Sequence, residues 1–222
     1  MIYNEDCLEG MKRIVDNSID LVVTVPPFNA NYGFDNDNLS EKEFNKFTTQ
    51  WIRECERISK RGIIFIIDTK YSLRFYKIPT IKYHHTYTHF KNNAIRGMYG
   101  GFANKTEVIC FTNKKPKKSS KFPSDVWTIP IIPQDIDHPT PKPIKLIDVI
   151  LEKFTEEDNI IFDPFIGSGT LAVSCLKNNR KFIGFEKEEK YYNIALKRIG
   201  KFDKTYYEKL PEEEKPAQQQ LF

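Results

Sequence analysis

The chain of 222 residues is long enough for one domain with a substantial core, and its hydrophobic fraction of 40% is too high for a disordered protein. The longest purely apolar run, residues 63–67, is far shorter than the ~20 residues that span a bilayer, and the first residues do not read as a signal peptide. We therefore expect a soluble, cytoplasmic protein without membrane contact, whose net charge of +4 does not by itself identify a partner.

Strand-like and helical patterns alternate along the chain. The strand-like runs are β-branched or aromatic and span residues 20–25, 62–67, 83–90, 106–112, 159–165 and 181–186. Helical periods fit residues 8–15, 144–154, 171–177 and 191–199, and a longer helix follows a capping box formed by Ser40 and Glu43. The alternation predicts an α/β fold with a mainly parallel, doubly wound sheet, in which ligands bind at the carboxyl ends of the strands.

One catalytic domain is expected over residues 1–203, followed by a flexible tail over residues 204–222 that is first acidic and then rich in glutamine. A Lys-, Ser- and Pro-rich segment, residues 114–137, interrupts the alternation and is expected to be an insertion. The four cysteines contain no C-x-x-C pair, which argues against a disulfide framework and against a metal site. We expect buried, reduced thiols.

The strongest motif is DPFIGSGT, residues 163–170, where an apolar strand gives way to a helix. Gly167 and Gly169 permit a tight turn close to a ligand, and the first helix N–H groups can donate to an anionic group. Glu186 ends the next strand about 20 residues later, where a carboxylate can accept hydrogen bonds from both hydroxyls of a ribose. The pair predicts a site for a nucleoside cofactor, the alternative being a strand–helix turn followed by an incidental surface glutamate.

A second motif, TVPPFN at residues 24–29, ends another apolar strand. Its two prolines fix the chain and remove two N–H donors, which leaves carbonyl oxygens directed into the expected cleft. Phe28 can stack on a flat group while the Pro26 carbonyl accepts from its N–H. The motif suits a planar, amino-bearing ligand, but taken alone it fits a rigid loop equally well.

A family resemblance emerges when these motifs are read together. The set comprises NEDC (4–7), TVPPF (24–28), DVW-x-IP (125–130), HPTPKP (138–143), DPFIGSGT (163–170) and GFE (184–186) followed by Tyr191 or Tyr192. It resembles the S-adenosylmethionine-dependent DNA amino-methyltransferases of the β group, in which the proline motif precedes the glycine-rich motif. The resemblance spans roughly residues 1–200 and implies a Rossmann-like methyltransferase fold with circularly permuted motif order.

The resemblance implies S-adenosylmethionine as cofactor and a role for each matching residue. The methionine part of the cofactor would contact Asp163, Phe165, Gly167, Ser168, Gly169 and Thr170, and its carboxylate would be bound by Thr140 and Lys142. Glu186 would bind the ribose, and Asp6 and Cys7 would contact the adenine. The catalytic turn would consist of Val25, Pro26, Pro27 and Phe28. This turn would receive a base that is swung out of double-stranded DNA, because the amino nitrogen is inaccessible inside the base stack.

Nucleic-acid contacts are expected from the region that the family uses for target recognition. Lys114, Lys115, Lys117, Lys118 and Lys121 are expected to contact phosphates, a solvated loop being the alternative. Asn92 is expected near the base pocket, and Arg96 and Tyr99 are candidates for reading bases. Because the region is short, we expect a short recognition sequence, or a homodimer or partner that supplies further contacts.

Val25 departs from the family's proline motif, which begins with Asp, Asn or Ser. Methyl transfer requires the amino nitrogen to pyramidalise, and two acceptors, the first side chain and the first proline carbonyl, hold its N–H bonds in that state. Valine accepts no hydrogen bond. Losing one such bond at a reacting centre costs about 3–4 kcal/mol, a factor of about 10² to 10³ in rate. We therefore expect weakened activity, in a natural or an inactivated variant.

Several alternatives stay open. The motif surroundings favour adenine N6 as the target, whereas Phe in place of Tyr at position 28 favours cytosine N4. The chain could also be a catalytically impaired module that binds cofactor and DNA, or a methyltransferase of RNA or protein amides, although those enzymes usually have the unpermuted order. The end of the chain, Gln218–Phe222, resembles peptides that dock on bacterial sliding clamps, the alternative being a solvated terminus.

Overall fold

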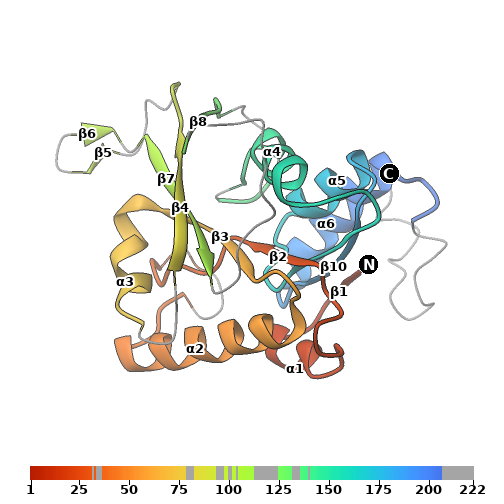
Figure 1. Cartoon of the computed structure of the whole chain (residues 1–222), viewed down its shortest axis with the longest axis horizontal. Coiled ribbons are helices and arrows are strands. Elements are labelled where there is room, and N and C mark those ends of the chain that lie inside the picture. Colours follow the sequence, from red (N-terminus) through yellow and green to blue (C-terminus); the bar gives the residue numbers. More distant parts are fainter. Residues whose placement is uncertain are drawn as a thin grey trace.

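An eight-stranded sheet with helices on both faces forms the body of the chain in a computed structural model (Figure 1). The structure describes residues 1–31, 33, 37–78, 83–93, 98–99, 102–103, 105–112, 125–131, 136–139 and 141–206. For residues 83–84, 98–99 and 102–103 it describes the backbone alone.

The sheet is mainly parallel, as the sequence predicts. Its strands are β1 (Ile2–Tyr3), β2 (Leu21–Thr24), β3 (Ile63–Asp68), β4 (Tyr83–Phe90), β7 (Thr106–Thr112), β8 (Val126–Thr128), β9 (Ile160–Asp163) and β10 (Lys181–Phe185). They lie in the order β1-β10-β9-β2-β3-β7-β4-β8, and the first five are mutually parallel. Strand β7 runs antiparallel to both β3 and β4, while β8 is parallel to β4. Two short strands, β5 (Met98–Tyr99) and β6 (Phe102–Ala103), form a separate pair.

Three helices cover each face of the sheet, which confirms the doubly wound α/β fold (Figure 1). One face carries α1 (Cys7–Met11), α2 (Glu41–Ile58) and α3 (Ser72–Tyr76), and the other carries α4 (Ile144–Phe154), α5 (Thr170–Lys177) and α6 (Glu189–Phe202). A single 3₁₀ turn, η1 (Thr69–Tyr71), precedes α3. Each set of helices encloses its own hydrophobic core against the sheet.

Helix α2 shows how local sequence fixes these elements. The Glu43 N–H donates to Ser40 Oγ at 3.3 Å and the Ser40 N–H donates to Glu43 Oε2 at 3.0 Å, so the predicted capping box is present. Beyond it, Phe44, Trp51 and Ile52 are buried along one face. All four cysteines are buried and unbridged, as predicted. Among the residues described, no helix is both long enough and apolar enough to span a bilayer.

The span expected as an insertion is partly built into the sheet. Val126–Thr128 pairs with β4 as the edge strand β8, because Trp127 is buried there and stacks on Tyr87 with ring centroids 4.8 Å apart. Residues 113–124 lie outside the described residues, and with them the five lysines expected to contact phosphate. The flexible tail predicted over residues 204–222 starts too early, because Tyr206 is buried and its hydroxyl accepts from the Ile2 N–H at 2.9 Å. Residues 207–222, including Gln218–Phe222, lie outside the described residues.

Candidate functional site

The proline turn and the glycine turn follow neighbouring parallel strands in the middle of the sheet. Strands β2 and β9 pair side by side, with Val22 opposite Phe162. From this point the chain continues to β3 on one side and to β10 on the other, which makes it the topological switch point where doubly wound sheets bind ligands. Thr24 Oγ1, at the end of β2, donates to Asp163 Oδ1, at the end of β9, over 2.5 Å.

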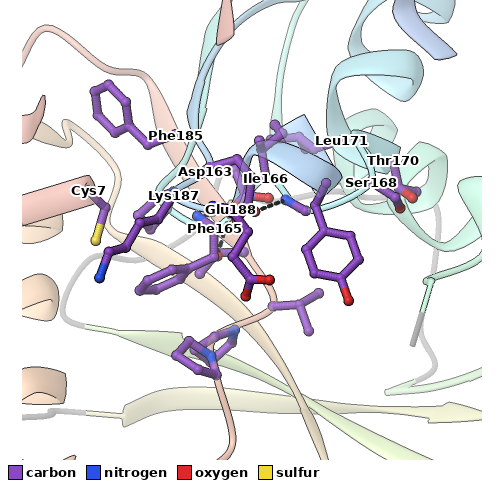
Figure 2. Close-up of a pocket in the computed structure, with 18 of the residues that line it drawn as sticks. Cys7, Asp163, Phe165, Ile166, Ser168, Thr170, Leu171, Phe185, Lys187 and Glu188 are labelled. Atoms are coloured by element: carbon purple, nitrogen blue, oxygen red, sulfur yellow. Dashed lines mark hydrogen bonds between the residues drawn. The ribbon is translucent and has the colours of Figure 1, made fainter. Parts of the chain in front are cut away.

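One pocket is lined by both turns. Its wall includes residues 25–28 from the proline turn and residues 163–168 from the glycine turn, together with Glu186 after β10. Figure 2 shows Asp163, Phe165 and Ser168 around this pocket, with Cys7 across from them. Two motifs that lie more than a hundred residues apart in the sequence therefore face the same cavity.

The glycine turn requires its glycines for two separate reasons. Gly167 and Gly169 have positive φ angles of 51° and 78°, a conformation that strains other residues. A Cβ on Gly169 would also lie 2.9 Å from the Ala195 Cβ, so the glycine lets α5 and α6 pack closely. The turn is further held by Arg198, whose Nη1 donates to the Ser168 carbonyl at 2.6 Å and to Thr170 Oγ1 at 3.1 Å.

Glu186 is joined directly to the glycine turn. Its Oε2 accepts from the Gly167 N–H at 2.9 Å and its Oε1 accepts from the Glu188 N–H at 2.9 Å. These bonds fix both carboxylate oxygens in the pocket wall. Burial raises the pKa of Glu186 to about 7. The glycines and the acid that the sequence pairs by spacing are thus in contact.

Asp163 connects the end of β2, which leads into the proline turn, to the glycine turn. Besides Thr24, its Oδ1 accepts from the Phe165 N–H at 2.9 Å. The side chain is buried, and burial raises its pKa to about 7 despite these two donors. A carboxyl group in this position ties the ends of β2 and β9 together and so fixes the distance between the turns.

The proline turn is held mainly by residues distant in sequence. Phe28 is buried and stacks on Tyr71, with ring centroids 5.3 Å apart and an interplanar angle of 25°. Arg74 Nη1 donates to the Phe28 carbonyl at 2.8 Å and also to the Asn29 carbonyl. Val25, whose side chain accepts no hydrogen bond, is half-buried in the pocket wall. The sequence analysis did not find Tyr71 or Arg74, which lie in a Lys-, Arg- and Tyr-rich run after β3.

His138 lies against the glycine turn from the HPTPKP segment. Its ring packs edge-on against Tyr191, with centroids 4.9 Å apart, and both residues line the pocket. A Cβ on Gly167 would lie 3.1 Å from His138 Nε2, so a larger residue would displace the ring. Burial, with nearby Lys142 adding to its effect, lowers the pKa of His138 to about 4, which keeps the ring neutral near pH 7.

Comparisons with known proteins agree with this geometry. The profile of a DNA methylase family matches residues 19–197. The chain is 30% identical over 227 residues to the type II methyltransferase M.HpaI of Haemophilus parainfluenzae, covering 87% of this chain and 72% of that one. It is 32% identical over 247 residues to the type II methyltransferase M.BglII of Bacillus subtilis, covering 87% and 67%. The chain belongs to the DNA methylase family of N6-adenine and N4-cytosine amino-methyltransferases.

Solved structures share the fold of this chain. The PvuII DNA methyltransferase, which is cytosine-N4-specific, superposes with a TM-score of 0.72 at 19% identity, over 89% of this chain and 85% of that one. The M1.HpyAVI–SAM complex superposes with a TM-score of 0.66 at 22% identity, over 90% and 98%. At these identities the match establishes the methyltransferase fold and leaves residue roles to be argued from the geometry.

Most residues expected at the amino-methyltransferase site line one pocket. From the expected set these are Asp6, Cys7, Val25, Pro26, Pro27, Phe28, Lys142, Asp163, Phe165, Gly167, Ser168, Thr170 and Glu186. Gly169 faces α6 instead, and Asn92 is exposed in the turn after β4, outside the pocket wall. Thr140 and Arg96 lie outside the described residues, and for Tyr99 only the strand backbone is described.

Proposed function

We propose that this chain transfers a methyl group from S-adenosylmethionine to the exocyclic amino group of a base flipped out of double-stranded DNA. The observation that carries the proposal is the single pocket shared by the proline turn and the glycine turn. A cofactor and a flipped base bound to these two turns would meet within one cavity, which is what direct transfer between them requires.

The residues on the cofactor side fit S-adenosylmethionine chemically. The Glu186 carboxylate, held by two backbone N–H groups, is placed to accept from ribose hydroxyls. The glycine turn leaves room for the methionine part beside buried Ser168 and Thr170. Asp6 and Cys7 also line the pocket, and the adenine would bind against them. When bound, the cofactor supplies an electrophilic methyl group on a sulfonium.

The residues on the base side act on the amino group. The Pro26 carbonyl would accept from one N–H of the target base, and Phe28 would lie against its face. The second N–H finds no side-chain acceptor at Val25. We therefore propose slow transfer, in which the alignment of the two reactants, worth up to ~7–11 kcal/mol in favourable cases, supplies most of the remaining rate enhancement.

Adenine N6 is the target that we favour, and cytosine N4 is the alternative because residue 28 is Phe. The experiment is to incubate the protein with mixed genomic DNA and methyl-labelled S-adenosylmethionine, digest the DNA to nucleosides and identify the labelled one. N6-methyldeoxyadenosine is the expected product. N4-methyldeoxycytidine would reverse the assignment of the base, and label confined to RNA or protein controls would overturn the proposed substrate.

A further inference from the structure

Four ionisable side chains form a buried network beside the proline turn. His89 lies on β4 and Lys91 just after it, Glu107 lies on β7, and Lys142 precedes α4. They are 0%, 8%, 5% and 8% exposed, respectively. Three strands or segments that are far apart in the sequence therefore place two lysines, a histidine and a carboxylate together in the interior.

Glu107 is the centre of this network. Lys142 Nζ donates to Glu107 Oε1 at 2.6 Å, and Lys91 Nζ lies 4.0 Å from the same oxygen. The other oxygen, Oε2, lies 3.0 Å from His89 Nδ1, and His89 Nε2 lies 2.9 Å from the Ile129 carbonyl oxygen. Although burial alone would raise the pKa of Glu107, the Lys142 ammonium and the other neighbours hold it well below its usual range.

A buried ionic network is weak evidence for stability, because removing ions from water costs several kcal/mol per ion and well-packed apolar residues of similar volume often stabilise a protein as well or better. This network also reaches the pocket through one of its residues. Lys142 lines the pocket, and its Nζ lies 5.8 Å from the centroid of the Phe28 ring. Lys91, His89 and Glu107 lie behind it, outside the pocket wall.

We propose that Lys142 donates a hydrogen bond to the unprotonated ring nitrogen beside the amino group of the flipped base, and that Glu107 is a positioning residue for it. The proposal rests on the proposed function. Adenine N1 and cytosine N3 are such acceptors next to the amino group, whereas the equivalent ring positions of guanine and thymine carry an N–H next to a carbonyl group. A fixed ammonium and the Pro26 carbonyl would together accept the first pair of bases and reject the second. This role differs from the cofactor contact that the family resemblance implies for Lys142.

A matched pair of lysine variants tests the proposal. Lys142→Met removes the cation that faces the pocket, and Lys91→Met removes a cation from the same network behind it. With genomic DNA and labelled cofactor, we expect Lys142→Met to lower kcat/KM for DNA by about 10- to 100-fold, the loss of a charged hydrogen bond. The Kd for S-adenosylmethionine should stay within about twofold, because this variant removes no cofactor contact. Lys91→Met should lower kcat/KM for DNA much less than Lys142→Met does, because Lys91 Nζ lies 4.0 Å from Glu107 Oε1 and does not line the pocket. Glu107→Gln should lower kcat/KM for DNA less than Lys142→Met does, and it should leave the Kd for S-adenosylmethionine unchanged.

Two outcomes of these variants would overturn the proposal. If Lys142→Met weakens S-adenosylmethionine binding and spares the DNA constants, the lysine serves the cofactor. If Lys142→Met and Lys91→Met lose activity equally, the network has a structural role alone. Cofactor calorimetry on the same preparations shows whether each variant is folded. Failure of the proposed function looks different, since the unmodified protein would then transfer no methyl group to DNA.

An altered target base tests the proposal without any variant. Once the recognition site has been read from methylated genomic DNA, a duplex is made in which the acceptor nitrogen of the target is replaced by C–H, as in 1-deazaadenine or 3-deazacytosine. The unmodified protein should methylate this duplex about 10- to 100-fold more slowly than the natural one. Equal rates on the two duplexes would overturn the proposal even if Lys142→Met failed to fold.

Discussion

The two walls of the pocket are built in different ways. On the side that we propose for the cofactor, a hydrogen bond joins Gly167 to Glu186, 19 positions later, and these two residues follow the successive strands β9 and β10. On the base side, the proline turn is held by Tyr71 and Arg74, more than 40 residues away. The described residues of the first wall include the Glu186 carboxylate and the Ser168 and Thr170 hydroxyls, whereas the second wall has no side-chain acceptor at Val25. The wall that we propose for the cofactor thus depends on contacts between nearby segments of the chain, and the wall that we propose for the base depends on contacts between distant ones.

The largest expected effect comes from restoring the acceptor on the base side. Val25→Asp should raise kcat for methyl transfer to DNA by about 10² to 10³, because the second amino N–H then finds a partner. Single-turnover transfer of labelled methyl groups measures it. Val25→Ala, which alters the side chain without adding an acceptor, is the control and should stay slow. If the unmodified protein, Val25→Asp and Val25→Ala transfer methyl groups at equal rates, the missing side-chain acceptor at position 25 does not limit transfer.

A smaller effect is expected from weakening the cofactor side. Glu186→Ala removes the carboxylate that would accept from the ribose and should weaken S-adenosylmethionine binding by about 100-fold. Calorimetry or equilibrium dialysis measures the change. Glu189→Ala, an exposed glutamate three residues along, should leave the affinity unchanged. An unaltered Kd in Glu186→Ala would mean that the ribose binds elsewhere.

The pH should act on the same carboxylate. Because the pKa of Glu186 is about 7, cofactor affinity should increase about tenfold between pH 6 and pH 8 as the carboxylate forms. The stability of the protein without cofactor should change with pH in the opposite direction. A carboxyl group with a raised pKa stabilises the folded state at low pH, and this stabilisation is lost as the pH rises from about 4.5 to 7. Asp163 titrates in the same range, so Glu186→Gln should reduce both trends without abolishing them. If the unmodified protein and Glu186→Gln show the same dependence of cofactor Kd on pH in calorimetric titrations, Glu186 is not the group responsible.

The smallest effect is expected from loosening the support of the proline turn. Arg74→Met removes the donor to the Phe28 and Asn29 carbonyls and should lower kcat about three- to tenfold, with cofactor affinity unchanged. Lys77→Met, at an exposed lysine beside the end of the same helix, is the matched control. A loss of cofactor binding in Arg74→Met would show that the two walls are not independent.

Sequence alone predicted the elements whose signals are local. The helix over residues 144–154 and the strand over residues 106–112 have the predicted bounds, since periodicity and flanking residues define them. The edge strand around Trp127 was taken for part of an insertion, because three residues between polar segments carry no strand pattern. Helix α3 was missed because it buries only Ser72 and Phe75, which is too few positions to show a helical period.

The site likewise contains residues that the sequence could pair and residues that it could not. Glu186 and the glycine turn could be paired by spacing along the chain. Glu107 and His89 could not, because their relation to Lys142 exists only once β4 and β7 pair antiparallel and the segment before α4 crosses them. The role of Arg74 likewise could not be predicted, because it donates to the carbonyl groups of Phe28 and Asn29, more than 40 residues away in the sequence.

Single-turnover methylation tests both walls of the pocket in one assay, with enzyme in excess over labelled S-adenosylmethionine and genomic DNA as acceptor. We predict slow transfer of label to an amino base by the unmodified protein, faster transfer by Val25→Asp, and transfer reduced below detection when Glu186→Ala is added to Val25→Asp. Absence of label in DNA from both the unmodified protein and Val25→Asp would contradict the claim that a cofactor and a flipped base meet in this cavity.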